Sequence, residues 1–132
     1  MNQAIIGIGS NIRPEENIPL ALRLLGETVT IEKVSALVTT SPIGLPNQPD
    51  FVNGAARVKT SLSRHELEQL LKKIEDLTGR DRTQPRFGPR TIDLDLVMWN
   101  GEITDPDYYT RAFLRTAVEE VRPSRPDSLP AV

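Results

Sequence analysis

The chain has 132 residues, enough for one domain with a substantial hydrophobic core. Its 16 basic and 18 acidic side chains nearly balance, which argues against nonspecific binding to nucleic acid. The absence of cysteine excludes disulfides and thiol chemistry, and no apolar run is long enough to span a membrane. The N-terminal stretch lacks the length and basic residues of a signal peptide, so we expect a soluble, cytoplasmic protein.

The first elements in the chain are a strand and a helix. Residues 4–9 predict a short buried strand that leads into a Gly-Ser-Asn turn. The following helix ends near Gly26 and presents one apolar face, formed by Ile18, Ala21, Leu22 and Leu25. Its start has two solutions: it begins near Asn17, or it begins earlier, around Pro14, and is distorted at Pro19.

A long strand, a loop and a further strand follow. Residues 29–40 predict one strand with a bulge, because their apolar alternation slips by one position. The Pro- and Gly-rich loop 41–50 is long enough to suggest a functional role. The strand 51–60 places Asn53 on the same face as Phe51. Asn53 could bond locally at a kink or recognise a ligand, and the aromatic neighbour favours a ligand.

The second helix is predicted over residues 63–77. Ser63 and Glu66 form a capping box at its start, and Gly79 stops it. Its apolar stripe consists of Leu67, Leu70, Leu71, Ile74 and Leu77. Glu75 lies at the edge of this stripe, one turn before an arginine-rich segment. It is either a surface charge or a functional group.

The segment 79–95 combines the features that point to chemistry. Its arginines are suited to phosphate oxygens, and they come just before two aspartates on a predicted strand. Ile92, Leu94, Leu96 and Met98 share one face of that strand, and the aspartates share the other. The Cα atoms of Asp93 and Asp95 should lie roughly 6.6 Å apart at the usual strand rise. Such a carboxylate pair favours a cation between them, and Mg²⁺ bound together with phosphate fits best.

Each feature of this segment also has an ordinary explanation. Paired aspartates can mark a solvated sheet edge, and arginine runs are usually exposed surface. Their combination on an otherwise apolar strand favours Mg²⁺-dependent chemistry on a nucleotide polyphosphate. A nucleotidyl transferase of the polymerase palm type is a further alternative, but the balanced charge and missing aromatic strip count against it.

The remaining sequence predicts a turn and a short helix. The helix covers residues 110–123, with Phe113, Ala117, Val118 and Val121 toward the core. We expect one domain over residues 1–122 and a poorly ordered, Pro-rich tail over 123–132. The element order β-α-β-β-α-β predicts a ferredoxin-like α+β fold with an extra C-terminal helix, mixed parallel and antiparallel pairing, and both main helices on one sheet face.

The motif RFGPRTIDLDLV resembles the signature of the 6-hydroxymethyl-7,8-dihydropterin pyrophosphokinases of folate biosynthesis. Further blocks agree in order, including the Gly-Ser-Asn opening and the SPIG and QPDFVNGA segments, so the resemblance runs from the first strand to about Trp99. It implies transfer of pyrophosphate from ATP to the pterin hydroxymethyl group, with Mg²⁺ as cofactor. It also implies small-molecule partners only, without nucleic acid or membrane, and a monomer.

The resemblance also implies roles for individual residues. Asp93 and Asp95 would bind one or two Mg²⁺ ions, and Arg80 and Arg82 would act with them in catalysis. The ATP-binding residues would be Lys72, Glu75, Arg82, Arg90, Leu96 and Arg111. The pterin-binding residues would be Thr40, Pro42, Ile43, Phe51, Asn53, Phe87, Asp93 and Phe113.

Two departures separate this chain from the family pattern. Phe87 stands where the family usually has Trp, and Pro106-Asp107 stands where it has a Pro-His pair that reaches ATP phosphate. The connection after Trp99 is also shorter. These differences leave two alternatives open: a divergent relative with another pterin or hydroxymethyl acceptor, and a non-catalytic relative that binds pterin or nucleotide.

Overall fold

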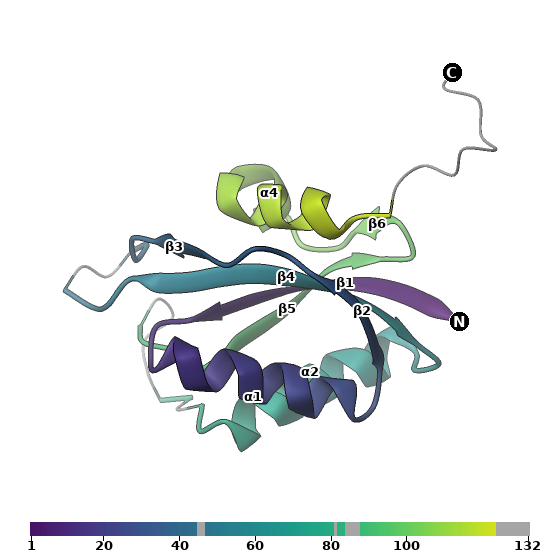
Figure 1. The fold of residues 1–132 in the computed structure, drawn as a ribbon, viewed down its shortest axis with the longest axis horizontal. Coiled ribbons are helices and arrows are strands. Elements are labelled where there is room, and N and C mark those ends of the chain that lie inside the picture. The colour runs from purple at the N-terminus through teal and green to yellow at the C-terminus, as the bar shows by residue number, and fades with distance from the viewer. Residues whose placement is uncertain (45–46, 81, 84–87, 124–132) are drawn as a thin grey trace.

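The computed structural model describes residues 1–44, 47–80, 82–83 and 88–123. A six-stranded sheet lies between two layers of helices (Figure 1). Helices α1 (Pro14–Gly26) and α2 (Arg64–Leu77) cover one face, and α4 (Ala112–Val121) covers the other. The expected α+β class and the shared face of the two main helices are confirmed.

The central strand of the sheet is β1 (Asn2–Ser10), which pairs with β4 (Phe51–Thr60) on one side and β5 (Asp93–Trp99) on the other. Two short strands pair with the other side of β4, namely β2 (Thr30–Val34) and β3 (Val38–Thr40). The other edge ends in β6 (Glu102–Ile103), which pairs with the end of β5. The strand predicted over residues 51–60 therefore has the expected bounds.

All strand pairs in the described part of the chain are antiparallel, so the expected mixture of pairings is wrong. Each helical crossover joins two strands that run in the same direction but are not neighbours. β4 lies between β1 and β2, and β1 lies between β4 and β5. The insertion of these strands removes every parallel contact.

The predicted long strand 29–40 is divided into β2 and β3. Ser35 lies at the break, where its hydroxyl accepts a hydrogen bond from Ala55 N (2.8 Å) and donates one to Ala36 O (2.9 Å). The Ala36 N–H is bound by the Glu120 carboxylate on α4 (2.9 Å). At this break, hydrogen bonds from side chains replace some of the backbone hydrogen bonds between strands, a substitution for which serine is well suited. The predicted slip in alternation thus corresponds to a register shift after Ile31 and a full interruption after Val34.

A bulge in β5 changes which side chains share a face. Ile6 pairs with Leu96 and Ile5 pairs with Met98, so Val97 is an extra residue on β5. Leu94 and Leu96 face the α1 and α2 layer, whereas Val97 and Met98 both face α4. The prediction that Met98 shares the face of Leu94 is therefore wrong. The two aspartates precede the bulge and keep their alternation.

The helices begin mostly as the sequence indicates. α1 begins at Pro14, after Arg13 in the left-handed region (φ 41°), and it includes Pro19, so the earlier of the two expected starts is correct. Ser63 and Glu66 form the capping box of α2. The prediction that Leu77 belongs to the apolar stripe of α2 is wrong, because Leu77 lies in the last turn and is 60% exposed.

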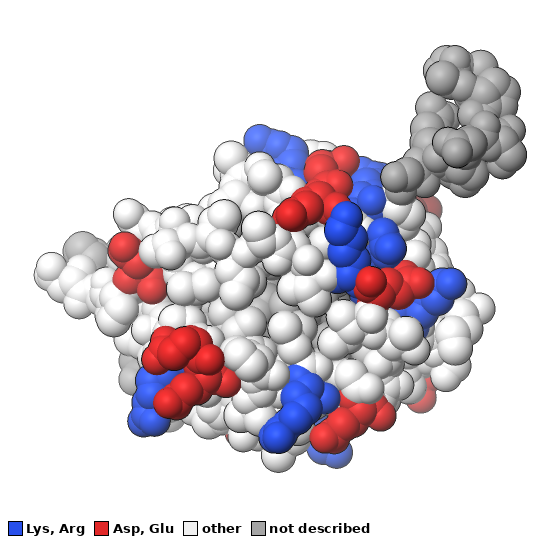
Figure 2. All heavy atoms as spheres, viewed as in Figure 1, with Lys and Arg blue, Asp and Glu red and all other residues white. Residues whose placement is uncertain are grey.

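The C-terminal region contains one element that was not predicted, the short helix α3 (Asp107–Thr110). α4 follows it and buries Ala117, Val118 and Val121 as expected, whereas Phe113 faces a cavity and not the core. No helix in the described ranges is long and apolar enough to cross a membrane. Figure 2 shows acidic and basic side chains intermixed on one face, in keeping with the near-neutral charge.

Candidate active site

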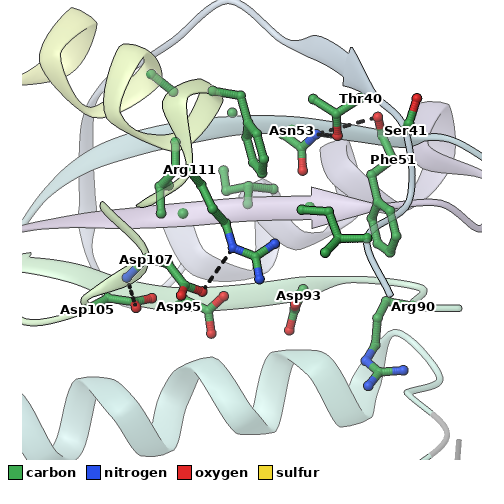
Figure 3. A pocket seen from close by; sticks show the side chains of 18 of the residues that line it. Thr40, Ser41, Phe51, Asn53, Arg90, Asp93, Asp95, Asp105, Asp107 and Arg111 are labelled. Atoms are coloured by element: carbon green, nitrogen blue, oxygen red, sulfur yellow. Dashed lines mark hydrogen bonds and ion pairs between the residues drawn. The ribbon is translucent and has the colours of Figure 1, made fainter. Parts of the chain in front are cut away.

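A cavity of about 520 Å³ lies between the sheet and the start of α4. Its lining brings together side chains from segments far apart in the sequence (Figure 3). Ten predicted site residues line it: Thr40, Ile43, Phe51, Asn53, Arg80, Arg90, Asp93, Asp95, Arg111 and Phe113. This convergence makes the cavity the candidate active site.

Two glycines of β1 form part of the cavity floor. Gly7 pairs with Asp95 and Gly9 pairs with Asp93 across the sheet. A Cβ atom at Gly9 would lie 3.2 Å from Asn53 Oδ1, and one at Gly7 would lie 3.2 Å from Leu114 Cδ1. The missing side chains therefore keep the floor open beside the two carboxylates. The predicted Gly-Ser-Asn turn begins at Gly9, and the signal for Gly7 was a glycine inside a strand, which often marks a close approach.

Asn53 and Phe51 lie at one end of the cavity, with Thr40 and Ser41 beside them (Figure 3). Asn53 is 8% exposed, and its Nδ2 donates to Thr40 Oγ1 at 2.7 Å. This bond orients the amide, which can both donate and accept, next to the ring of Phe51. The arrangement suits a flat ligand with a polar edge.

Four carboxylates lie toward the other end of the cavity: Asp93, Asp95, Asp105 and Asp107. The surrounding protein desolvates the Asp95 carboxyl and, with the charge of Asp93, raises its pKa to about 7, although the side chain is open to the cavity. Asp105 and Asp107 add to this shift. Sequence reasoning missed Asp105, because only the β6 turn and α3 bring it beside β5.

Glu75 connects α2 with the strand that carries the aspartates. Its Oε2 accepts a hydrogen bond from Leu94 N (2.9 Å), a backbone group between the two aspartates. β6 pairs with β5 only at Met98 and Trp99, so this edge of β5 is open to a side chain. Burial raises the pKa of Glu75, against the Leu94 hydrogen bond and nearby arginines. Glu75 is therefore a buried connecting group and not a surface charge.

Arg80 bridges two of these carboxylates. Its Nη1 lies 3.3 Å from Glu75 Oε1 and 3.3 Å from Asp93 Oδ1. Its Nε is buried without a hydrogen-bond partner among the described residues. The Arg80 side chain also lines the cavity, where a guanidinium can bind an anionic ligand.

A second, smaller cavity of about 200 Å³ adjoins the first and shares Arg80, Asp93 and Asp95 with it. Three predicted ATP-binding residues line only this one: Lys72, Glu75 and Leu96. The two aspartates thus lie where the cavities meet. One ligand could occupy each cavity and meet the other at the carboxylates.

Some predicted site residues lie elsewhere. Arg82 lines neither cavity and binds back to α2, with Nε 2.9 Å from Asp76 Oδ1 and Nη2 3.4 Å from Glu75 Oε1. Pro42 is described but does not line either cavity. Phe87 lies outside the described residues, as do Arg86 and the predicted tail from residue 124.

Arg90 is held by a residue that sequence reasoning passed over. Arg90 N donates to Asn11 Oδ1 (2.8 Å), and Asn11 Nδ2 donates to Gln48 Oε1 (2.9 Å) and Pro49 O (3.1 Å). Asn11 therefore connects loop 41–50 with the segment before β5. Arg90 is only 7% exposed, and burial lowers its pKa. The Gly-Ser-Asn turn was the available signal for Asn11.

Within the described part of the chain, no group of three or more His, Cys, Asp and Glu side chains forms a metal site. Asp93 and Asp95 offer two carboxylates, which is the usual protein share of a Mg²⁺ site completed by water and phosphate. Burial raises the pKa of Asp95, and repulsion by Asp93 adds to the rise; a divalent cation would relieve that repulsion. The residues present therefore fit such an ion bound together with a polyphosphate.

Most of the chain matches one known protein family. Residues 5–123 match the family described as 7,8-dihydro-6-hydroxymethylpterin-pyrophosphokinase (HPPK). The chain belongs to the HPPK family. The match covers every strand beyond the first residues of β1 and all the helices, so the resemblance seen in the motifs extends through the divergent region after Trp99.

Two curated pyrophosphokinases are similar to this chain over most of their length. A 2-amino-4-hydroxy-6-hydroxymethyldihydropteridine pyrophosphokinase of Bacillus subtilis (strain 168) is 38% identical over 91% of this chain and 78% of that protein. The Pseudomonas aeruginosa protein of the same name is 35% identical over 93% of this chain and 82% of its own. A folate synthesis bifunctional protein of Arabidopsis thaliana is 38% identical over 74% of this chain, which spans only 20% of that protein.

Proposed function

We propose that the joined cavities catalyse transfer of a pyrophosphoryl group from ATP to 6-hydroxymethyl-7,8-dihydropterin, the HPPK reaction of folate biosynthesis. The pterin hydroxymethyl oxygen attacks the β-phosphorus of ATP and loses its proton. The bond from the β-phosphorus to the oxygen of the α-phosphate breaks, and AMP leaves. The observation that carries the proposal is the convergence of Asp93 and Asp95 with the Asn53, Thr40 and Phe51 group in one cavity.

The two cavities divide the substrates in this proposal. The pterin occupies the larger one, where Asn53 and Thr40 bind its polar edge and Phe51, Ile43 and Phe113 contact its ring. The adenosine end of ATP occupies the smaller one, beside Lys72 and Leu96. The reacting groups then meet at Asp93 and Asp95, which line both cavities.

The carboxylates and arginines provide the electrostatics of the transfer. Asp93 and Asp95 would hold one or two Mg²⁺ ions, which neutralise phosphate charge when bound. Arg80 pairs with Asp93 and lines the same cavity as both aspartates, so its guanidinium would bind a phosphate oxygen there. Phosphoryl-type transfer depends mainly on such positioning and charge stabilisation, so these groups suffice without a covalent intermediate.

Arg82 and Arg90 have different parts in the proposal. Arg82 is bound to Asp76, and it would leave this partner to reach the phosphates of ATP. Arg90, whose backbone N–H is held by Asn11, lines the larger cavity and would bind the phosphates of ATP where they enter that cavity. Small molecules are then the partners, and a monomeric, cytoplasmic protein stays a prediction from the sequence.

Identification of the products tests the function. The purified protein is incubated with ATP and Mg²⁺, with and without 6-hydroxymethyl-7,8-dihydropterin, and the nucleotides are separated by chromatography. AMP that appears only with the pterin supports pyrophosphoryl transfer. ADP would indicate an ordinary kinase, pyrophosphate release would indicate a nucleotidyl transferase, and the absence of any product would indicate a binding protein.

A further inference from the structure

An ion pair joins Asp107 of α3 to Arg111, the residue between α3 and α4, and both side chains line the larger cavity. Arg111 Nε lies 3.4 Å from Asp107 Oδ2. We propose that Asp107 is a positioning residue, which holds the Arg111 guanidinium over the carboxylate end of the cavity for the polyphosphate of ATP. This proposal rests on the proposed function.

The local backbone makes Asp107 a stable support for Arg111. Asp107 N donates to Asp105 Oδ1 (2.9 Å), and Arg111 N donates to Asp107 O (2.9 Å). The two residues are therefore joined through the backbone as well as through their side chains. Figure 3 shows the Arg111 side chain directed toward the aspartates of β5.

α3 is in turn fixed on α4. Arg115 Nη1 donates to Tyr108 O (3.3 Å) and Tyr109 O (3.1 Å), and Tyr108 OH donates to Glu119 Oε2 (2.8 Å). Tyr108 also packs against the apolar cluster beneath α4. Arg115 is thus bound to backbone carbonyl groups of α3. It does not line the cavity, whereas Arg111 does.

Asp107 has two opposite effects on a bound polyphosphate. Its own negative charge repels phosphate, and its ion pair restricts Arg111 to conformations that reach the cavity. An unrestrained arginine loses considerable side-chain entropy when it binds a ligand, so a preset conformation favours binding. Positioning prevails if the loss of Asp107 weakens ATP binding only while Arg111 is present.

A double-mutant cycle separates these effects. Asp107→Asn, Arg111→Ala and the double variant are titrated calorimetrically with α,β-methylene-ATP in Mg²⁺. We expect Asp107→Asn to weaken binding about 2- to 5-fold in the wild-type background, the range of an exposed ion pair. In the Arg111→Ala background the same change removes only repulsion, so binding should stay equal or become tighter.

Asp105→Asn is the matched control. It removes a carboxylate of the same cavity but keeps the Oδ1 acceptor for Asp107 N, and it should tighten binding equally in both backgrounds. Asp107→Glu retains the charge and should recover much of the lost affinity. An unchanged melting temperature for Asp107→Asn, together with a change confined to the KM for ATP, distinguishes positioning from structural damage.

Two results would overturn the proposal. Asp107→Asn could tighten binding equally with and without Arg111, in which case Asp107 is only repulsive. Arg111→Ala could also leave binding unchanged, in which case Arg111 does not contact the nucleotide. Neither result affects the proposed function, which depends on pterin-dependent formation of AMP by the wild-type protein.

Discussion

Arg80 and Asp93 form an ion pair of 3.3 Å at the point where the two cavities meet. The guanidinium thus neutralises one of the two carboxylates proposed to bind Mg²⁺. A divalent cation that binds Asp93 must compete with this arginine, and its arrival would free Arg80 for phosphate. The pair therefore links metal binding to the availability of the proposed catalytic arginine.

We predict that Arg80→Gln tightens the binding of divalent metal without nucleotide while it lowers turnover. Loss of a partly buried ion pair should raise the affinity for Mn²⁺, measured by electron paramagnetic resonance, roughly 3- to 10-fold. Arg111→Gln is the control, because Arg111 lines the same cavity but pairs with Asp107. If both variants tighten Mn²⁺ equally, the effect is long-range electrostatics and the Arg80 pair has no special part.

Asp95 should destabilise the ligand-free protein at neutral pH. Its folded pKa is raised from 3.8 to about 7, so the folded state holds the proton more tightly than the unfolded chain. The protonated carboxyl therefore stabilises the folded state at low pH. This contribution to the free energy of unfolding is lost as pH rises from about 4 to about 7. Asp95→Asn should raise the melting temperature at pH 8, and the difference should disappear near pH 3.8.

The expected rise is roughly 2–4 °C, the effect of about 1 kcal/mol in a domain of this size, because solvent in the cavity screens the charge. The same variant should lose Mg²⁺-dependent ATP binding and nearly all turnover, since it removes one proposed metal ligand. A variant that turned over at the wild-type rate would refute the metal assignment. A melting temperature of Asp95→Asn below that of the wild type at pH 8 would refute the prediction that the ionised Asp95 carboxylate destabilises the fold.

Arg82 should act in the transition state more than in ground-state binding. It is held by Asp76 and lines neither cavity, so a conformational change would be needed to bring it to phosphate. Arg82→Ala should reduce kcat by about 100-fold or more and change the KM for ATP little. Asp76→Asn, which releases Arg82 without removing it, should retain turnover. If Arg82→Ala changed only the KM for ATP, Arg82 would bind phosphate in the ground state and would not act specifically in the transition state.

Gly9 should control access of the pterin. A Cβ at this position would lie 3.2 Å from Asn53 Oδ1 and 3.9 Å from Phe51 Cδ1, in the proposed pterin end of the cavity. Gly9→Ala should raise the KM for the pterin about 10-fold, because displacement of the Asn53 amide weakens its hydrogen bonds. Binding of ATP should not change. Equal weakening of both substrates would show that the cavity is not divided as proposed.

Features that depend on neighbouring residues in the chain were predictable from the sequence. The capping box of Ser63 and Glu66 needs only one helical turn, and β4 has clear apolar alternation between a loop and that cap. The alternation that places Asp93 and Asp95 on one face is also local, and it survives in β5. Family motifs added the expectation that Asn53 and the aspartates belong to one site.

The tertiary structure decided the features that need partners from distant segments. The bulge at Val97 arises from pairing with β1, and it moves Met98 to the opposite face from the predicted one. Asn11 binds a backbone group 79 residues away, and Glu75 binds Leu94 N across 19 residues. Local periodicity carries no information on such contacts, because side-chain alternation is the same whichever strand lies alongside. The approach of Asp105 and Asp107 to Asp95 is decided in the same way, since the turn after β6 and the packing of α3 on α4 bring them to the cavity.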